Sequence, residues 1–336
     1  MAPPSNLITD VKGIRVGHAD DATLASGVTV VLVEAPNVAS GTTRGGAPGS
    51  RDTGLLEPEM TVEGVDAVVL SGGSAFGLDA AGGVMDALRE RGVGLAVASA
   101  VVPIVVQAIV FDLLNGGDKA WGTSSPYAGL GREAVAASTG GAFPLGTVGG
   151  GFGATTCNLK GGLGSASATT SFGATVGAIA VVNAVGSAVV GDGPHFWAAP
   201  YERDGEFGGL GFPQRVGQQD LAMRMKGRAP PSTTIALVAT DATLTKPQAK
   251  RLAIMADDGL ARALRPAHAP MDGDTVFAVA TQRRAPVGPV DLAELGYTAA
   301  DCLARAIARG VYEATALPFA GALPAWKDRF RGGDPL

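Results

Sequence analysis

Hydrophobic residues along the chain follow two spacings, one typical of strands and one typical of helices. Short runs rich in β-branched or small apolar side chains predict strands at residues 28–33, 67–70, 178–183, 234–240 and 275–281. Apolar positions three and four residues apart predict helices over residues 75–91 and 246–264, and the pattern recurs within 289–315. Because the two patterns are mixed without the regular period of a parallel barrel, they favour an α/β fold of two stacked sheets flanked by helices.

Two kinds of segment interrupt these patterns. Residues 41–54 and 140–164 are dense in glycine, and we expect loops or close-packed turns there because glycine adopts positive φ without steric cost. Residues 200–231 are polar and end in the sequence APP, directly before a strand-like run that starts at Ser232. An exposed, proline-ended loop that leads into a buried strand is a place where a chain can be cut without losing its fold.

The composition indicates which residues fill the core and which kinds of binding partner are excluded. Hydrophobic residues make up 46% of the 336 residues but aromatic residues only 5%, so the core must be built mainly from Ala, Val, Leu and Gly in closely approaching elements. A net charge of -5, with no basic run longer than the pair at 283–284, argues against a nucleic-acid partner. The two cysteines and three histidines are scattered, so we expect no disulfide framework, no metal and no cofactor.

No membrane segment or targeting signal is indicated. The most apolar stretch, residues 93–114, is interrupted by a proline, a glutamine and an aspartate, which indicates a buried element rather than a membrane span. The first twenty residues lack a basic segment followed by an apolar core, so they are not typical of a signal peptide and we expect a cytoplasmic protein.

The run PPSTTIALVAT, residues 230–240, joins two prolines to a segment of strong strand character. If the peptide bond before Thr233 is cut, the threonine hydroxyl and a free α-amine belong to one residue at the tip of a strand. A free α-amine has a pKa of about 7.7 to 8.0, so it can accept the hydroxyl proton near neutral pH and no histidine is required. Taken alone, however, threonines at a strand start are ordinary structural residues.

The sequence GGSAFG, residues 72–77, offers two other interpretations. It superficially resembles a nucleophile elbow, but its spacing is G-x-S-x-x-G and no histidine has a supporting context. Because a helix pattern follows it, the segment also leaves open a binding protein that holds a phosphate at the helix N-terminus.

Four further residues carry candidate chemistry. Asp272 and Asp274 stand two residues apart at the entry to a strand, so their side chains point to one side and can orient an ammonium and a hydroxyl. A calcium loop lacks its remaining ligands here, and a plain Asp-Gly turn is the simpler alternative. Lys160, in a glycine-dense stretch, can support developing negative charge or be a solvated charge. Asn183, an amide in an apolar strand, is either a structural hydrogen-bonding residue or an oxyanion donor.

Five segments together resemble the family of L-aminopeptidase/D-esterases, β-peptidyl aminopeptidases and nylon-oligomer hydrolases, which are self-cleaving N-terminal-nucleophile enzymes. The resemblance covers nearly the whole chain, and five segments in this order are specific although each is weak alone. They are RGGAPGSRDTGLLEP (44–58), LSGGSAFGLDAAGGVM (70–85), KGGLGSAS (160–167), STTIALVATDATLTKPQAKRLAIMADDGLARALRP (232–266) and MDGDTVFA (271–278).

The resemblance implies a four-layer αββα sandwich, and the expectation of stacked sheets rests partly on it. It implies a single domain over residues 1–336 that is cut between Ser232 and Thr233 into a large subunit, 1–232, and a small one, 233–336. Relatives often carry Asn before the nucleophilic Thr, where this chain has Ser232. We expect processing to survive that change because this residue supplies only the leaving acyl group, and the match of TTIALVAT disfavours Ser232 as the attacking residue.

By the same resemblance, Thr233 is the nucleophile and Asn183 lies at the oxyanion or substrate position. Lys160 supports the nucleophile, and Asp272 and Asp274 orient its amine and hydroxyl. The Asp-Gly-Asp motif is most similar to the nylon-oligomer hydrolase branch.

The resemblance also implies the substrate class and the assembly. Expected substrates are short peptides with a free amino terminus, β-peptides, D-amino-acid amides or esters, or 6-aminohexanoate oligomers. The expected assembly is a homo-oligomer, a tetramer or larger, of cleaved heterodimers. A self-cleaving acyltransferase of the ornithine acetyltransferase type is the alternative enzyme, because it shares threonine-initiated processing.

Overall fold

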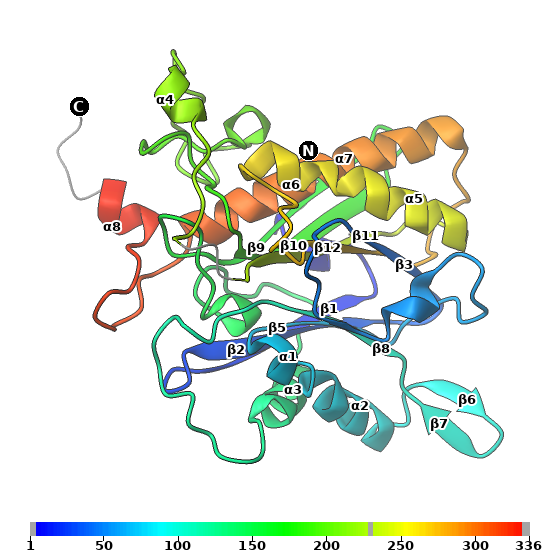
Figure 1. The fold of residues 1–336 in the computed structure, drawn as a ribbon. Coiled ribbons are helices and arrows are strands. Elements are labelled where there is room, and N and C mark those ends of the chain that lie inside the picture. Colours follow the sequence, from blue (N-terminus) through cyan, green and yellow to red (C-terminus); the bar gives the residue numbers. More distant parts are fainter. Residues whose placement is uncertain (1–4, 228–230, 331–336) are drawn as a thin grey trace.

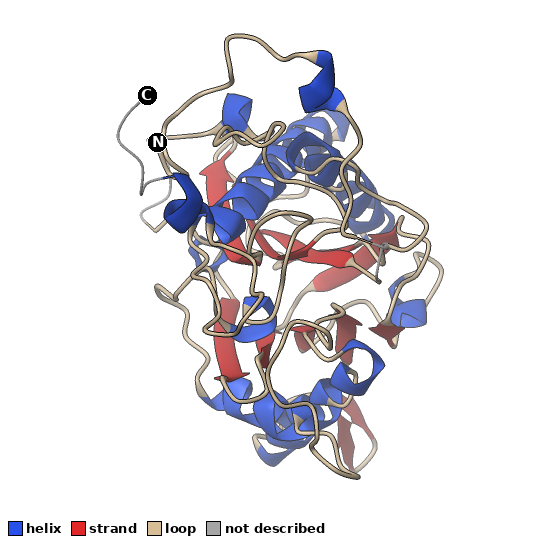
Figure 2. Cartoon of the chain, turned by 60° about the vertical axis from the view of Figure 1, so that its left-hand side comes forward, coloured by secondary structure: helices blue, strands red, loops and turns tan. Residues whose placement is uncertain are grey.

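Two sheets stacked face to face, each covered by helices on its outer side, make up the computed structural model, which describes residues 5–227 and 231–330 (Figure 1). The strand order is β1-β2-β5-β8-β4 in the first sheet and β3-β12-β11-β10-β9 in the second. The turned view in Figure 2 separates the two strand layers from the helices above and below them. This arrangement confirms the expected α/β fold with two stacked, helix-flanked sheets.

The strands of the two large sheets and of one separate hairpin have the following bounds. The first sheet contains β1 (Ile14–Asp21), β2 (Ser26–Val33), β4 (Ser50–Arg51), β5 (Ala67–Ser71) and β8 (Val105–Ile109). The second contains β3 (Val38–Thr43), β9 (Gly162–Thr169), β10 (Thr175–Asn183), β11 (Thr233–Thr240) and β12 (Thr275–Ala280). The hairpin pairs β6 (Leu95–Val97) with β7 (Ala100–Val102).

Helices cover the outer face of each sheet (Figure 1). The first sheet carries α1 (Ser74–Gly77), α2 (Ala80–Glu90) and α3 (Tyr127–Ala136), and the second carries α5 (Lys246–Ala256), α6 (Asp258–Ala263) and α7 (Pro289–Tyr312). Short helices in the connections are α4 (Gln218–Leu221), α8 (Trp326–Phe330) and the 3-10 turns η1 (Ile8–Asp10), η2 (Thr53–Leu56), η3 (Gly149–Gly151) and η4 (Ala199–Tyr201).

Strand β11 is buried on both faces, which explains its continuous apolar sequence. Ile235 and Leu237 point into the core between the sheets, whereas Ala236 and Val238 point into the core beneath the helices. All eight residues of β11 are buried. A strand covered on both sides lacks the alternation of polar and apolar residues seen in half-exposed strands. The position of β11 in the middle of its sheet fixes the surroundings of its first residue.

Small residues let helix α7 lie close against β9. A Cβ atom on Gly164 of β9 would clash with the carbonyl oxygen of Ala306 in α7, and one on Gly162 would clash with that of Gly310. Close approach of this kind is what the high content of Gly and Ala in the sequence predicts.

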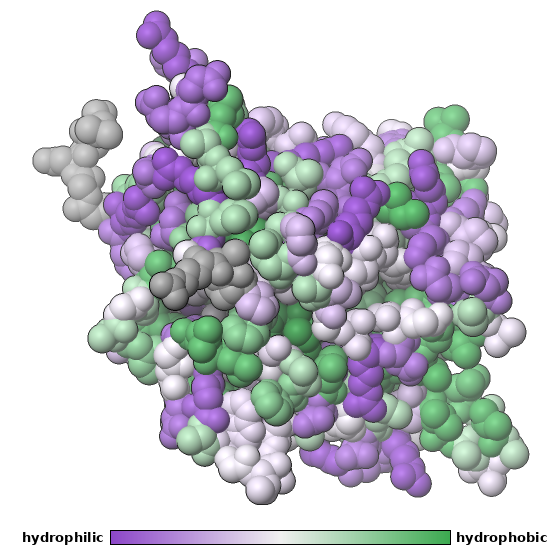
Figure 3. Space-filling model, viewed as in Figure 1, coloured by the Kyte–Doolittle hydropathy of each residue, from purple (hydrophilic) through white to green (hydrophobic). Residues whose placement is uncertain are grey.

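The predicted elements agree with the structure except where an apolar run turns outward. All five predicted strands and the three helix patterns are confirmed, although residues 75–91 divide into α1 and α2 and residues 246–264 into α5 and α6. The expectation of a buried element over residues 93–114 is wrong for its first half. Hairpin β6–β7 projects from the body, and hydrophobic residues gather over it at the lower right of Figure 3. Leu95 is 46% and Val97 54% exposed.

The glycine-dense segments are only partly loops. Residues 41–54 contain the end of β3 as well as β4, and β9 begins inside the segment 140–164. The segment 200–231 is a largely exposed or half-exposed connection, as expected, but Ala229 and Pro230 lie outside the described residues. None of the helices in the described ranges has both the length and the apolar composition that crossing a membrane requires.

The contact between α7 and β9 predicts a specific destabilisation. Replacing Gly164 with Ala should lower the free energy of unfolding by about 1–3 kcal/mol, because the added methyl group forces the helix away from the sheet. Gly129→Ala in helix α3 is the matched control, since its Cβ would meet no atom within 4 Å. The control should be neutral or stabilising by up to about 1 kcal/mol. Equal denaturation midpoints for the two variants in urea would contradict this account of the packing.

Candidate active site

Thr233 is the first residue of β11, and the strands on either side bring the other candidate residues to it. Antiparallel β10 places its last residue, Asn183, directly opposite Thr233. On the other side, the parallel pairing with β12 continues one step before the strand, where Ser232 pairs with Asp272. Thr233 is 3% exposed and Ser232 1%. The sheet therefore assembles a buried polar cluster from three segments that are distant in sequence.

The carbonyl group of Ser232 is held by two donors. The Thr233 hydroxyl donates a hydrogen bond to the Ser232 carbonyl oxygen. The backbone N–H of Gly273 donates to the same oxygen at 2.9 Å. A Cβ on Gly273 would lie 2.9 Å from Thr233 Oγ1 and 2.7 Å from the Ala47 carbonyl oxygen, so the close approach requires glycine. Sequence reasoning did not single out this N–H, although Gly273 stands between the two candidate carboxylates.

Asp272 and Asp274 are both buried and both accept backbone hydrogen bonds. Asp272 Oδ1 accepts from Val185 N at 3.3 Å and its Oδ2 from Ala269 N at 3.2 Å. Asp274 Oδ1 accepts from Thr234 N at 2.8 Å, one residue beyond the candidate nucleophile. Burial, and then the charge of Asp274, raise the pKa of Asp272 to about 6. Asp272 is therefore a group that titrates close to neutral pH within the site.

Asn183 has partners on both sides of its amide. Its Oδ1 accepts from Thr155 N at 3.0 Å and from Lys226 Nζ at 3.1 Å. Its Nδ2 donates to the Phe111 carbonyl oxygen at 2.9 Å, and the second N–H of that nitrogen has no hydrogen bond to a residue that the structure describes. The amide is thus firmly oriented, and one of its donors is not used by the described part of the chain.

Lys160 is fully buried near this cluster but does not bond to Thr233. Its Nζ donates to three carbonyl oxygens, those of Gly151 at 3.1 Å, Ala154 at 2.8 Å and Gly161 at 2.8 Å. Burial lowers the pKa of Lys160 to about 7, while three acceptors favour the ammonium form. Lys160 pairs with Thr155 in an isolated β-bridge, and Thr155 N donates to Asn183 Oδ1, so the backbone links Lys160 to Asn183.

Lys226 is a second lysine at the site, half-buried, which sequence reasoning missed because it lies in a polar loop. Its backbone N–H donates to the Val185 carbonyl oxygen at 3.0 Å. Its Nζ donates to the backbone carbonyl oxygen and to the side-chain Oδ1 of Asn183, each at 3.1 Å. Burial lowers the pKa of Lys226 to about 7, against the opposing charge of Asp272. Two lysines and two carboxylates thus share one region of the site.

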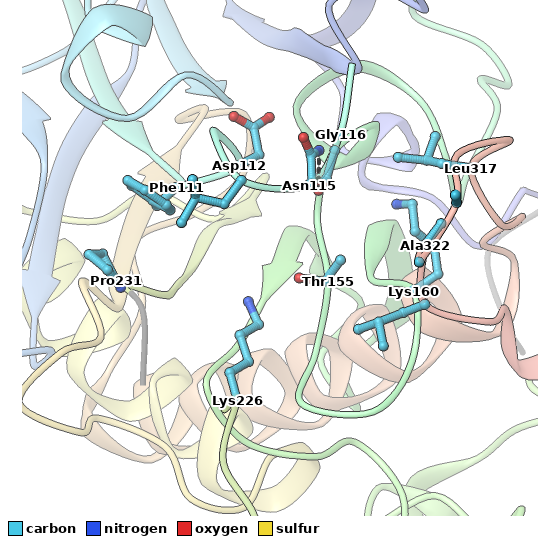
Figure 4. Close-up of a pocket in the computed structure, with 15 residues that line it drawn as sticks. Phe111, Asp112, Asn115, Gly116, Thr155, Lys160, Lys226, Pro231, Leu317 and Ala322 are labelled. Carbon is cyan, nitrogen blue, oxygen red and sulfur yellow. Dashed lines mark hydrogen bonds between the residues drawn. The ribbon is translucent and has the colours of Figure 1, made fainter. Parts of the chain in front are cut away.

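A cavity of about 250 Å³ opens beside Pro231, two residues before Thr233. Lys226 reaches into it, with Thr155 between Lys226 and Lys160, and Pro231 forms part of the wall (Figure 4). The rest of the lining is mostly apolar, with Phe111, Leu114, Leu317, Ala322 and Leu323. Its size suits a small acyl group or a short peptide rather than a polymer strand.

His268 is the other residue that sequence reasoning left without a role. Its Nδ1 lies 2.9 Å from Asp274 Oδ2 and its Nε2 lies 3.1 Å from Asp257 Oδ2. The carboxylates of Asp257 and then Asp274 raise the pKa of His268 to about 10, so its ring is an imidazolium at neutral pH. No motif spacing signals these contacts, because they arise from the connection between α6 and β12.

The segment GGSAFG, residues 72–77, is occupied by contacts within the protein. Ser74 has a φ of 53° after strand β5, as a nucleophile elbow would, but the three histidines make their described hydrogen bonds to other residues. The backbone N–H of Gly73 donates to Asp112 Oδ1 at 2.7 Å, so this donor already holds an internal carboxylate. The helix that begins there, α1, is a single turn. Neither the elbow nor the phosphate site gains support.

Comparisons with known proteins show which family the chain belongs to. The sequence matches peptidase family S58 over residues 6–322. An uncharacterized aminopeptidase of Mycobacterium tuberculosis is 46% identical, and the match covers 97% of this chain and 98% of that protein. A 6-aminohexanoate-oligomer endohydrolase of Paenarthrobacter ureafaciens is 28% identical, with 81% of this chain and 74% of that protein covered.

Solved structures show the same fold at lower sequence identity. A β-aminopeptidase of a Burkholderia species superposes with a TM-score of 0.72 at 23% identity, over 100% of this chain and 96% of that one. An L-aminopeptidase D-Ala-esterase/amidase from Ochrobactrum anthropi, described as a variant of the Ntn hydrolase fold, gives 0.71 at 21% identity, over 99% and 94%. The predicted family resemblance is confirmed.

The raised pKa of Asp272 makes a testable statement about stability. A carboxyl whose pKa is about 6 in the folded chain and 3.8 in an unperturbed aspartate binds protons more tightly when folded, so stability falls as pH rises from about 4 to 6. Relative to its parent, Asp272→Asn should therefore gain roughly 1–3 kcal/mol of unfolding free energy between about pH 4.5 and 7.5. Urea unfolding of both chains in a Thr233→Ala background, where neither can be cut, measures the difference. A difference independent of pH would contradict the assignment.

Proposed function

This chain belongs to peptidase family S58, and from that premise we propose that it is a self-processing hydrolase of amide bonds whose nucleophile is Thr233. One observation carries the proposal. The Thr233 hydroxyl is hydrogen-bonded to the carbonyl group of the preceding residue, while Gly273 N–H donates to the same oxygen. A nucleophile beside a carbonyl that is already held by a backbone donor is the arrangement that acyl transfer requires.

The first stage matures the chain. Thr233 Oγ1 attacks the Ser232 carbonyl carbon, the Oγ1–C bond forms, the C–N bond breaks, and the hydroxyl proton passes to the Thr233 nitrogen. Water then hydrolyses the ester, which leaves a carboxylate on Ser232 and a free α-amine on Thr233. In this stage Gly273 N–H stabilises the oxyanion on the Ser232 oxygen.

The second stage is turnover on an external amide. The neutral α-amine of Thr233 accepts the hydroxyl proton, Oγ1 attacks the substrate carbonyl, and the amine product leaves with a proton. Water resolves the acyl-enzyme and restores the hydroxyl. The second N–H of the Asn183 amide, which bonds to none of the described residues, is a suitable oxyanion donor because Asn183 lies opposite Thr233 and is held in place by Thr155 and Lys226.

The remaining residues act through charge and position. Asp272 and Asp274, on the β12 side, orient the amine and the hydroxyl of Thr233. Lys160 supports the nucleophile through the positive potential of its buried ammonium rather than by direct contact. The cut would leave β11 paired on both sides, so the subunits 1–232 and 233–336 stay together as one domain.

The substrate class follows from the family and the cavity. We propose short peptides and amino-acid amides as substrates, because the cavity is small and mostly apolar, and because many relatives are named aminopeptidases. 6-Aminohexanoate oligomers are the more distant possibility, supported by relatives that are 27% to 28% identical. An acyltransferase would share the first stage and differ only in passing the acyl group to an amine instead of water.

The nucleophile assignment predicts a sharp contrast between three variants. Thr233→Ala should abolish chain cleavage and lower turnover by roughly a thousandfold or more, because the attacking oxygen is gone. Thr233→Ser keeps a hydroxyl and should retain both activities at a reduced level. Ser232→Ala, the matched control, should still be cut, because that residue contributes only the acyl group. Denaturing gels and the hydrolysis of amino-acyl anilides measure the two effects.

The same assay separates the rivals. Release of free acid from the anilides without an added amine indicates a hydrolase, whereas product formation that depends on an acceptor amine would indicate an acyltransferase. Full activity of Thr233→Ala would rule out the proposed nucleophile. A 6-aminohexanoate oligomer in the same panel tests the nylon-oligomer branch.

We also propose a closed homo-oligomer of cleaved heterodimers. The exposed apolar hairpin β6–β7 supports it, because large exposed apolar patches on a folded protein mark contact surfaces. Light scattering on the purified protein should give a mass of four or more chains of 33.5 kDa. A mass of one chain would contradict the assembly without touching the chemistry.

A further inference from the structure

Four alternating charges connect the surface to the start of β11. Arg44 Nε lies 3.2 Å from Asp257 Oδ2, and His268 Nε2 lies 3.1 Å from the same oxygen. His268 Nδ1 lies 2.9 Å from Asp274 Oδ2, and Asp274 Oδ1 accepts from Thr234 N at 2.8 Å. We call Arg44, Asp257, His268 and Asp274 the ion-pair chain.

The two carboxylates in the ion-pair chain are buried, so their charges need compensation. The side chains of Asp257 and Asp274 are 1% and 2% exposed, whereas that of Arg44 is 44% exposed. Neither carboxylate oxygen of Asp257 has a hydrogen-bond partner among the residues described, so the two ion pairs at Oδ2 compensate its charge. A buried carboxylate without such partners is strongly unfavourable.

His268 is held in an unusual backbone conformation at this point. Its φ is 57°, in the left-handed region that residues other than glycine rarely adopt. Its backbone N–H and its ring Nδ1 both bond to Asp274 Oδ2, each at 2.9 Å. Such conformations persist where the surroundings fix them, and they are concentrated at functional sites.

The imidazolium also offsets part of the charge of Asp274, which acts on Asp272. The charge of Asp274, after burial, raises the pKa of Asp272, and Lys226 opposes that rise from the other side. His268 faces Asp274 and Asp257, and Arg44 faces Asp257. Without a positive charge at residue 268, the charge of Asp274 would act on Asp272 with less opposition.

We propose that His268 is a positioning residue of the active site, which holds Asp274 against the start of β11 and offsets the charge of Asp274 beside Asp272. The inference rests on the proposed function, in which both carboxylates orient Thr233. Asp257 and Arg44 hold the imidazolium in place from the far side. A purely structural ion pair would do no more than fasten the connection between α6 and β12.

The pH dependence of chain cleavage distinguishes these roles. Chains from cell-free synthesis are transferred to buffers between about pH 5 and 9, and intact mass follows the first-order loss of the full-length form. On the acid side of the pH–rate profile, which we call the acid limb, the cleavage rate rises with pH. In His268→Gln this limb should move up by about one pH unit, so the rate near pH 6 falls about tenfold. Near pH 9 the rate of the variant should approach that of the wild type. His268→Arg restores the charge and should keep the wild-type limb.

Turnover of an amino-acyl anilide by the matured variants provides a second readout. His268→Gln should lower kcat with the same shifted limb and leave KM within about twofold, because His268 touches the carboxylates and not the substrate. Arg283→Gln, which removes an equivalent charge from a surface ion pair with Glu34, is the matched control and should shift nothing. If His268→Gln does not fold, Asp257→Asn, which loosens the imidazolium, should shift the limb in the same direction by a smaller amount.

The outcomes distinguish a failure of the proposed self-processing function from a failure of the role proposed for His268. A wild-type chain that is never cut would overturn the proposed function and this inference with it. A wild-type chain that is cut, together with folded variants whose rates fall equally at every pH or do not fall, would overturn the role of His268 alone.

Discussion

The parallel pairing of β11 with β12 is the constraint on which the site depends. Parallel strands begin at the same edge of a sheet, so the residues just before β12 meet the residues just before β11. That pairing brings Gly273 N–H to the Ser232 carbonyl oxygen and Asp274 to the backbone of Thr234. Antiparallel β10 then adds Asn183 from the other side. A shift of one residue in either register would move Thr233 away from these residues and reverse the buried faces of β11.

Charge balance within this buried cluster is the second requirement. Lys160 and Lys226 lie on the cavity side, and Asp272 and Asp274 lie on the β12 side, with His268 behind them. Each charge has partners, either backbone groups or opposite charges, which makes burial tolerable. The cost is visible in the pKa values, since burial moves those of Asp272, Lys160 and Lys226 toward neutrality. Groups poised in this way suit proton transfer better than they suit stability.

The sequence predicts the fold well because local patterns and burial agree over long segments. The apolar runs of β10, β11 and β12 and the spacing within α7 all predict their elements. The pattern fails at residues 93–102, because an apolar hairpin that faces solvent has the same composition as a buried strand. It also hides β9, whose glycines serve the contact with α7 rather than a loop.

The candidate residues were predictable only where a motif carries them. Thr233, Asn183, Asp272 and Asp274, which the resemblance names, lie near one another at the start of β11, and Lys160 is joined to Asn183 through Thr155. Gly273 N–H, Lys226 and His268 depend on backbone geometry and on contacts between distant segments, for which a single sequence gives no signal.

The central claim is that one residue supplies both the attacking oxygen and the proton acceptor, which requires Thr233 to be a chain terminus. N-terminal sequencing of the fragments in an amide-hydrolysing preparation tests it most directly. The account predicts two sequences in equal amounts, that of the original N-terminus and one that begins Thr-Thr-Ile-Ala-Leu. A single N-terminal sequence from a fully active, unbroken chain would contradict it.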